Sequence, residues 1–204
     1  MRTIFSRRLP HLLAALLCCG ATNAFAHEGG DHAHAPARAV NLSTRMKVDR
    51  GDNVLIGGFI IVGTGEKRVA LRGVGPSLPV SGALGDPTLE LYDSTGSLVL
   101  SNDNWRSNQQ DELIATGLAP THDNEAALIA TLTAGSYTAV VRGANDTTGV
   151  ALVEVYDLDA ANSTARMANL STRGNVLKGD DVMIGVLIIT GDTSKRMIAR
   201  VPGP

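Results

Sequence analysis

Apolar residues in this chain occur in short runs separated by glycine-rich turns. Residues 54–62 form a near-continuous apolar run rich in isoleucine and valine, which is too short for a typical helix and predicts a strand buried on both faces. We expect residues 68–74 to pair with this strand across a short turn. Apolar and polar positions alternate in residues 88–93, and residues 98–100 return after a turn, which predicts a hairpin.

The second half of the chain continues the same pattern. Three further strands are predicted, at residues 126–132, 137–142 and 150–156, and a short helix is expected only at residues 109–116. Short strands at regular spacing, with no long helical period, are typical of a β-sandwich or barrel. The sequence therefore predicts an all-β, antiparallel protein.

Part of the chain is repeated. Residues 38–76 (the first copy) and residues 166–204 (the second copy) align without a gap at an offset of 128, and 20 of the 39 aligned positions are identical. A repeat at a fixed spacing indicates an array of one supersecondary unit. The printed chain is thus predicted to hold one full unit, residues 38–164, and the first third of a second unit, residues 165–204.

The two copies are expected to adopt the same three-stranded shape. Ile56 and Ile60, with their equivalents Ile184 and Ile188, are predicted to be buried in both copies because the apolar pattern matches position for position. We expect the extra strands to close back on the sheet of the first unit. The alternative is an open apolar edge, which invites pairing with another chain.

Residues 1–26 have the features of a secretory signal peptide. Basic residues precede a short apolar stretch, and residues 24–26 (Ala-Phe-Ala) form the small-x-small pattern that signal peptidase cleaves. The stretch is shorter than the ~20 residues that span a bilayer, and no other segment is long and apolar enough. A lipoprotein start at Cys18 or Cys19 is the alternative, which we disfavour because the preceding residue is not small. We predict an exported protein that begins at His27 and is secreted, periplasmic or on the cell surface.

Removal of this signal changes the composition. Both cysteines lie within it, so the mature chain has none, which excludes disulfides, zinc–thiolate sites and cysteine nucleophiles. The mature chain carries 15 Lys and Arg against 20 Asp and Glu, a balance of −5, because three of the 18 basic residues leave with the signal. That balance gives no reason to expect nucleic acid or an anionic membrane as a partner. The remaining length suits one domain, or one domain plus part of another.

The new N-terminus would carry several histidines. Residues 27–37 (HEGGDHAHAPA) are small, polar or charged and predict a disordered tail. His27, His32 and His34 are candidates for binding copper, nickel or zinc, since imidazole is a common ligand of these metals. We favour a soluble spacer, because the rest of the chain offers no matching pair of histidines.

The sequence carries no recognisable catalytic arrangement. His122 is the only histidine of the predicted folded region, and it lies in a turn-like stretch. The Gly-x-Ser-x-Gly elbow, the His-Glu-x-x-His motif and the Walker A loop are absent from the sequence. Paired carboxylates such as Asp157 and Asp159 lie in or near turns, where solvated charge is expected rather than a glycosidase pair. We predict a protein that is not an enzyme and uses no cofactor.

Two binding chemistries remain. The loops around Asp103 and Asp123 are rich in the oxygen ligands that calcium prefers, although neither loop has EF-hand spacing and Asn and Asp are also ordinary turn residues. Trp105 is the only candidate for the flat aromatic platform of a sugar site. Because tryptophan has a large apolar surface and one N–H donor, we favour Trp105 as an anchor that holds its loop to the sheet.

Several motifs resemble known families. The segments NLSTR, GDNVLIGGFII, GVGPSL and GSYTAVVRGANDTTGVALVEVYDLD resemble a repeat of uncharacterised function in large exported bacterial proteins, over residues 38–204. Residues 89–156, with LELYDSTGSL, the Asn102-Asp103-Asn104 stretch and AGSYTAVV, also resemble the bacterial pre-peptidase C-terminal domain. This second resemblance implies a jelly-roll-like β-sandwich with an accessory role, in a family some of whose members bind calcium or substrate polymers. It supplies no catalytic residues.

These observations lead to two hypotheses about function. The first is a non-catalytic structural or adhesive β-repeat module of the cell surface or secretome, with a cell-surface polymer or neighbouring repeat modules as partner. The second is an accessory domain that binds calcium or a polysaccharide. An accessory domain should present a concave site around Trp105 or clustered acids around Asp103. A structural repeat should present a flat polar surface and an unfinished edge near the C-terminus.

Overall fold

The structure is a computed structural model, and it describes residues 35–160, 163–179 and 181–202. Its ten strands are β1 (Arg38–Val48), β2 (Leu55–Val62), β3 (Lys67–Val74), β4 (Pro87–Tyr92), β5 (Leu98–Asn102), β6 (Ala126–Leu132), β7 (Gly135–Gly143), β8 (Gly149–Asp157), β9 (Arg166–Arg173) and β10 (Ile184–Thr190). The described part also holds one α-helix, α1 (Gln110–Thr116), and two 3-10 turns, η1 (Trp105–Ser107) and η2 (Ala144–Asp146). The predicted signal peptide and the three tail histidines lie outside the described residues.

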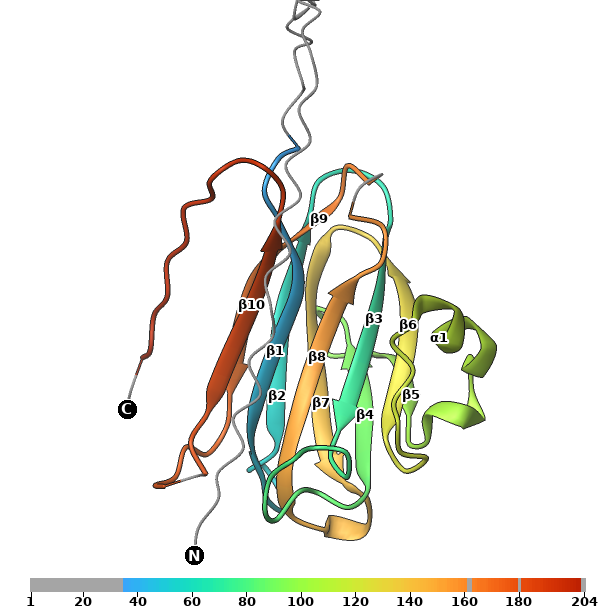
Figure 1. The fold of residues 1–204 in the computed structure, drawn as a ribbon, viewed down its shortest axis with the longest axis vertical. Helices are drawn as coiled ribbons and strands as arrows, with labels where there is room; N and C mark the ends of the chain where they lie inside the picture. Colours follow the sequence, from blue (N-terminus) through green and yellow to red (C-terminus); the bar gives the residue numbers. More distant parts are fainter. Residues whose placement is uncertain (1–34, 161–162, 180, 203–204) are drawn as a thin grey trace, which may run out of the picture. The chain divides into compact units, whose positions relative to one another are not determined.

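The strands form one antiparallel sheet that curls into a nearly closed barrel (Figure 1). Along the sheet the order is β5-β4-β7-β2-β9-β1-β8-β3-β6, and β10 pairs with β1 outside this path. The all-β, antiparallel class predicted from the alternating pattern is confirmed. In place of the expected jelly-roll-like sandwich of two sheets, the strands form one sheet that is nearly closed into a barrel. The hairpin of β4 and β5 and the short helix α1 also form where the sequence indicated.

The core fills the inside of the barrel, and β2 shows how the sequence builds it. Leu55, Phe59 and Ile61 point inward and are each at most 1% exposed. Phe59 stacks on Tyr137 of β7, with the two ring centroids 5.6 Å apart. The positions between them along β2 are half-buried. The strand therefore has one inner and one outer face, because side chains alternate along it, and the prediction of two buried faces is wrong.

The burial predicted for the four repeated isoleucines is also wrong. Ile56 and Ile60 lie on the outer face of β2 and are half-buried, and Ile184 and Ile188 on β10 are 40% and 47% exposed. The apolar run predicts a strand with two buried faces, whereas every second residue of β2 faces outward. The inner positions of this strand are occupied instead by the residues next to each isoleucine.

Strand β3 lies in a different part of the sheet from β2. It pairs with β6 and β8, which contradicts the prediction that it would return along β2. Both edges of β2 are already occupied, by β7 on one side and β9 on the other. The chain after β2 therefore crosses to another part of the barrel. In the second copy, residues 195–202 form no strand, so the predicted three-stranded shape holds there for two strands only.

The two ends of the sheet path, β5 and β6, face each other without a strand ladder in the described residues. Side-chain amides take the place of a ladder. Asn102 Oδ1 accepts a hydrogen bond from Ala127 N at 3.0 Å. The Gln109 amide accepts from Ile129 N and donates to the Ile129 carbonyl, both at 2.9 Å. With α1 and η1 packed over the same part of β6, this edge is protected from pairing with other strands.

Candidate functional site

The strands of the two copies are paired reciprocally. Strand β1 of the first copy pairs with β10 of the second, and β2 of the first pairs with β9 of the second. The registers agree: Arg45 lies opposite Ile184, and Ile56 lies opposite Arg173, so the offset of 128 converts one pair into the other. Both ladders also skip the same position, Val40 in β1 and Ala168 in β9. We call β1, β2, β9 and β10 the junction.

Equivalent residues of the two copies meet at the centre of the junction. The hydroxyls of Thr44 and Thr172 are 2.7 Å apart, and these residues are 128 positions apart in the sequence. Ala39 forms a bridge with Met167, its own equivalent. In an interface with a two-fold axis, both partners use the same surface, so residues on the axis contact their own equivalents. The paired strands and the contacts between equivalent residues at the junction follow this pattern. The two copies therefore face each other like two subunits of a symmetric dimer.

One pair of equivalent residues at this centre differs in size. Met46 is buried at 1% exposure, and its equivalent Gly174 lies against it. A Cβ atom on Gly174 would overlap the thioether end of Met46. A large side chain in one copy therefore fills the space left by the glycine of the other, which two methionines could not share.

Glycine is required at one equivalent position in both copies. Gly63 has φ 107° and Gly191 has φ 111°, a conformation that side chains with a Cβ rarely adopt. A Cβ on Gly63 would collide with the carbonyl of Thr164, and one on Gly191 with the carbonyl of Pro36. Thr164 and Pro36 are themselves 128 positions apart, so the same close approach of backbone is made twice.

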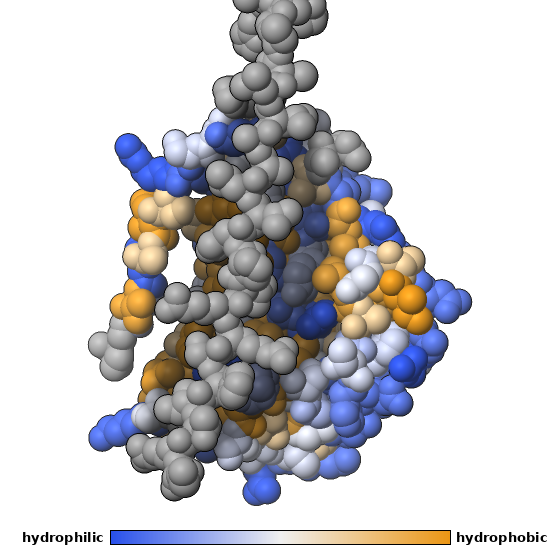
Figure 2. Space-filling model, viewed as in Figure 1, coloured by the Kyte–Doolittle hydropathy of each residue, from blue (hydrophilic) through white to orange (hydrophobic). Residues whose placement is uncertain are grey.

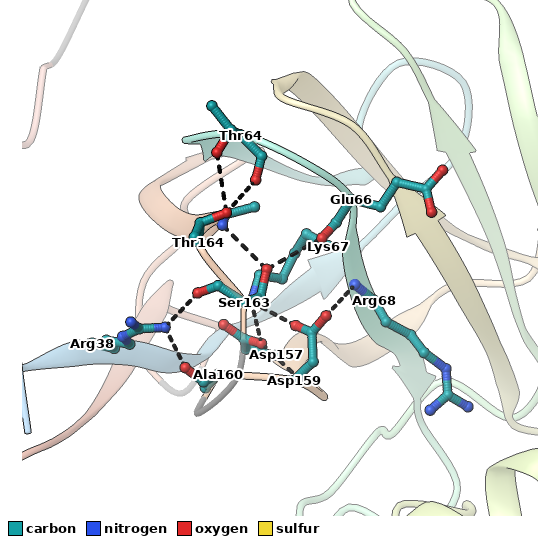
Figure 3. Close-up of polar contacts among 11 residues, drawn as sticks. Arg38, Thr64, Glu66, Lys67, Arg68, Asp157, Asp159, Ala160, Ser163 and Thr164 are labelled. Carbon is teal, nitrogen blue, oxygen red and sulfur yellow. Dashed lines mark hydrogen bonds and ion pairs between the residues drawn. The ribbon is translucent and has the colours of Figure 1, made fainter.

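A buried ion cluster lies where the first copy meets the connection to the second (Figure 3). Lys67, at the start of β3, is fully buried, and its Nζ lies 2.9 Å from Asp157 Oδ1 and 2.5 Å from Asp159 Oδ1. The Arg68 N–H donates to Asp159 Oδ2 at 3.3 Å, and the Asp159 N–H donates to Asp157 Oδ1 at 3.1 Å. The cation thus has two carboxylates as partners in a site without water contact at Lys67 or Asp157.

The two carboxylates of this cluster are perturbed in opposite directions. Burial raises the pKa of Asp157 above its ordinary value, although the hydrogen bond and charge of Lys67 oppose it. For Asp159 burial also acts to raise the pKa, but the hydrogen bonds from Lys67 and from the Arg68 N–H outweigh it and the pKa is lowered. Asp159 Oδ1 also lies closer to Lys67 Nζ than Asp157 Oδ1 does, at 2.5 Å against 2.9 Å.

Hydrogen bonds hold the connection between the copies against the same place. Ser163 Oγ donates to the Glu66 carbonyl at 3.2 Å, and Thr164 Oγ1 donates to the Thr64 carbonyl at 2.6 Å. Arg38 Nη1 donates to the Ser163 carbonyl at 2.8 Å (Figure 3). The start of β1, the turn after β2 and the segment before β9 are thereby joined in one polar network.

The candidate binding residues near Trp105 contact one another and the neighbouring loop. Trp105 is 2% exposed, and its Nε1 donates to the His122 carbonyl at 3.2 Å. The Arg106 guanidinium covers the ring at 4.1 Å from its centroid, and Arg106 Nε also lies 2.6 Å from Asp123 Oδ1. Trp105 thus anchors the loop and has no open face for a sugar. Asp103 accepts from the Asn104 amide at 3.3 Å, so the two candidate calcium ligands have separate partners.

Two fully buried charged groups were not indicated by the sequence. The first is Lys67, whose only signal was the repeated Lys-Arg pair at the start of the expected third strand. The second is Glu125, which is fully buried and accepts from Gly75 N at 3.1 Å, Ser77 N at 3.0 Å and Ser77 Oγ at 2.5 Å. Glu125 therefore fixes the Gly-Pro-Ser turn, a role that nothing in its sequence neighbourhood indicates.

The comparisons with known proteins give no relative. No protein-family model, no curated protein and no solved structure matches the chain. Within the described residues no group of three or more His, Cys, Asp or Glu side chains is placed to hold a metal ion. None of the described helices has the length and apolarity needed to cross a bilayer.

Proposed function

We propose that the protein is a non-catalytic, exported β-repeat module with a structural or adhesive role at the cell surface or in the secretome. The observation that carries this proposal is the reciprocal ladder of the junction, in which each copy supplies the strand that the other needs. A sequence unit that pairs with its own repeat in matching register is suited to building assemblies of such units. The signal-peptide pattern of residues 1–26 supports export, and the resemblance to a repeat of large exported bacterial proteins agrees with it.

The proposed role requires the second copy to be part of the folded unit. Removal of residues 165–204 would strip β9 from β2 and β10 from β1. We expect the shortened protein to lose thermal stability and to self-associate, because two paired edges become free. A shortened protein that is monomeric, soluble and as heat-stable as the full chain would show that the second copy is dispensable.

Export and location test the other half of the proposal. The intact mass of the protein recovered from the cell surface or medium should correspond to a chain that begins at His27. Protease added to intact cells should degrade it if it is displayed on the surface. Retention of residue 1, a lipid-modified Cys18 or Cys19, or recovery from the cytoplasm alone would contradict the proposal.

An accessory domain that binds calcium or a polysaccharide is the second candidate. It is favoured by a depression next to the Trp105 loop, lined by the polar residues 106–112, and by the approach of Asp86 to Asp103. Burial, and then the charge of Asp103, raise the pKa of Asp86, which is the situation that a bound cation relieves. Titration with calcium should then raise the melting temperature, and Asp103→Asn should abolish that rise. An unchanged melting temperature in millimolar calcium would argue against this candidate.

A further inference from the structure

The junction leaves one edge of each second-copy strand without a ladder in the described residues. Strand β10 is hydrogen-bonded to β1 on one side only, and β9 is paired with β2 and touches β1 at a single bridge. The exposed side chains of β10 are aliphatic: Ile184, Val186, Ile188 and Ile189 are 40%, 47%, 47% and 38% exposed. Figure 2 shows apolar surface on the side of the molecule where Figure 1 places β10.

This edge lacks two of the features that normally prevent strand pairing. Proteins protect sheet edges with charged residues, prolines, bulges or covering loops. Strand β10 contains neither a charged residue nor a proline. At the β5–β6 edge, by contrast, side-chain amides and α1 cover the free backbone groups. The chain thus protects one edge and leaves the other ready to pair.

The first copy shows what covers the same edges when a unit is complete. The second edge of β2 pairs with β7, with Leu55 opposite Val141 and Ile61 opposite Gly135. The second edge of β1 pairs with β8, with Asn41 opposite Tyr156. Strands β10 and β9 are the equivalents of β2 and β1. By equivalence, the open edge of β10 would pair with a strand like β7 (a β7-type strand), and the open edge of β9 with a strand like β8 (a β8-type strand).

Identical residues support this assignment, because they are covered in one copy and open in the other. Asn41 and Ser43 are 3% and 6% exposed under β8, whereas their equivalents Asn169 and Ser171 are exposed. The same contrast holds for lysine. Lys67 is buried against the two aspartates that end and follow β8. Its equivalent Lys195 is exposed and donates to the Ala37 carbonyl at 3.3 Å.

We infer that the open edges of β9 and β10 are a docking site for the β7–β8 strand pair of another repeat unit, and that Lys195 receives the Asp-x-Asp sequence at the end of that pair. This inference rests on the proposed function. The partner is a segment equivalent to residues 77–164 whose β7- and β8-type strands are free. A second copy of this chain does not qualify, since its β7 and β8 already have a partner on both edges.

The test is a longer chain in which the β7- and β8-type strands are supplied in sequence. A second copy of residues 77–164 is attached after Pro204, the equivalent of Pro76. Hydrogen exchange of the backbone amides of β9 and β10 is measured by mass spectrometry in the natural and the extended chain. We expect exchange at these strands to slow by about ten-fold or more in the extended chain. A chain extended by a Gly-Ser sequence of equal length is the control and should exchange like the natural protein.

A single lysine makes the test specific for the docked geometry. Lys195→Met should leave the urea midpoint of the natural chain unchanged and lower that of the extended chain. If the extended chain is insoluble, a synthetic peptide of residues 135–159, which includes both aspartates, is added to the original chain instead, with a scrambled peptide as control. The peptide should slow exchange at β9 and β10.

Three results would overturn the inference. The first is exchange at β10 in the extended chain, or with the peptide, that equals the control. The second is a Lys195→Met variant of the extended chain with an unchanged midpoint. The third is concentration-dependent protection of β10 in the natural protein, which would make a second copy the occupant. A protein that docks the segment but stays inside the cell would contradict the proposed function and leave the docking site intact.

Discussion

Replacement of Lys67 by methionine tests the buried ion cluster directly. Methionine matches the length of the lysine stem and removes the ammonium group that contacts Asp157 and Asp159. Asp157 is fully buried, and its remaining hydrogen bond from the Asp159 N–H, at 3.1 Å, does not neutralise its charge. The variant therefore keeps a carboxylate in the core without the cation that balances it.

The expected loss of stability is large. Removal of one partner of a buried ion pair costs about 3–5 kcal/mol, because the desolvated charge of the other partner is left uncompensated. For a domain of this size each kcal/mol shifts the melting temperature by about 2–4 °C, so a decrease of roughly 10 °C is expected. Exposed ion pairs contribute about 0–1 kcal/mol, so a loss of several kcal/mol distinguishes a buried cluster from a surface pair.

Lys195→Met is the matched control, because Lys195 occupies the equivalent position in the second copy and is exposed. Urea unfolding followed by circular dichroism should give a much lower midpoint for Lys67→Met and an unchanged one for Lys195→Met. A second substitution, Asp157→Leu, should restore part of the stability of Lys67→Met, since it removes the unpaired charge. Equal effects of the two lysine substitutions, or a loss below about 1 kcal/mol for Lys67→Met, would refute the reasoning.

The same variant should change how stability depends on pH. The raised pKa of Asp157 contributes stability at low pH, which is lost as the pH rises through the folded-state value. The lowered pKa of Asp159 contributes stability above the unfolded value, which is lost as the pH falls. With Lys67 present, the contributions of Asp157 and Asp159 to the pH dependence of stability therefore have opposite signs. Without Lys67, burial dominates at both carboxyl groups and raises their pKa values. The variant's loss of stability relative to the original chain should therefore grow as the pH rises above about 4.

Three further experiments test the packing, with urea unfolding as the measurement in each case. Ile61→Ala should cost about 2–5 kcal/mol, whereas Ile189→Ala at the equivalent, exposed position should cost less than about 1 kcal/mol; equal costs would show that β10 is as well packed as β2. Gly174→Met should destabilise by about 1–3 kcal/mol, and Met46→Gly added to it should restore stability; strictly additive losses would mean that the two residues do not share one space. Trp105→Ala should cost about 3–5 kcal/mol, and a smaller loss would contradict its role as an anchor.

Local patterns in the sequence predicted where the strands and the helix lie along the chain. They predicted poorly which strands pair with each other in the sheet. The alternation in β4 and the glycine turn after it were sufficient for the β4–β5 hairpin, because the partners are adjacent in the chain. The same logic failed for β2 and β3, which are also adjacent but lie in different parts of the sheet. Pairing is decided by which edges are free, and β2 has both edges occupied by strands far away in the sequence.

The candidate site could not be predicted from the sequence, because it too depends on contacts between residues that are far apart along the chain. The repeat revealed that two segments are equivalent, but equivalent segments can stack side by side or pair reciprocally, and the identities are the same in both cases. Lys67 and Asp157 are 90 positions apart, and nothing near either residue indicates a buried ion. Trp105 illustrates the converse: its two possible roles, a sugar platform or an anchor, differ only in burial, which the sequence does not specify.

The two open edges of the second copy differ in the polarity of their exposed side chains. This difference determines which edge contributes more binding free energy when another strand docks. The exposed positions of β9 include Asn169 and Ser171, whose polar side chains are solvated at little cost when no strand covers them. Strand β10 exposes aliphatic side chains along its whole length, and each of them favours removal from water. Docking therefore gains most of its free energy from the burial of side chains on β10. The backbone N–H and C=O groups on the open edge of β9 fix the register of the docked strand. A partner that pairs with β9 alone should bind weakly, and substitution of Val186 or Ile188 by lysine should weaken docking far more than substitution of Ser171 by lysine.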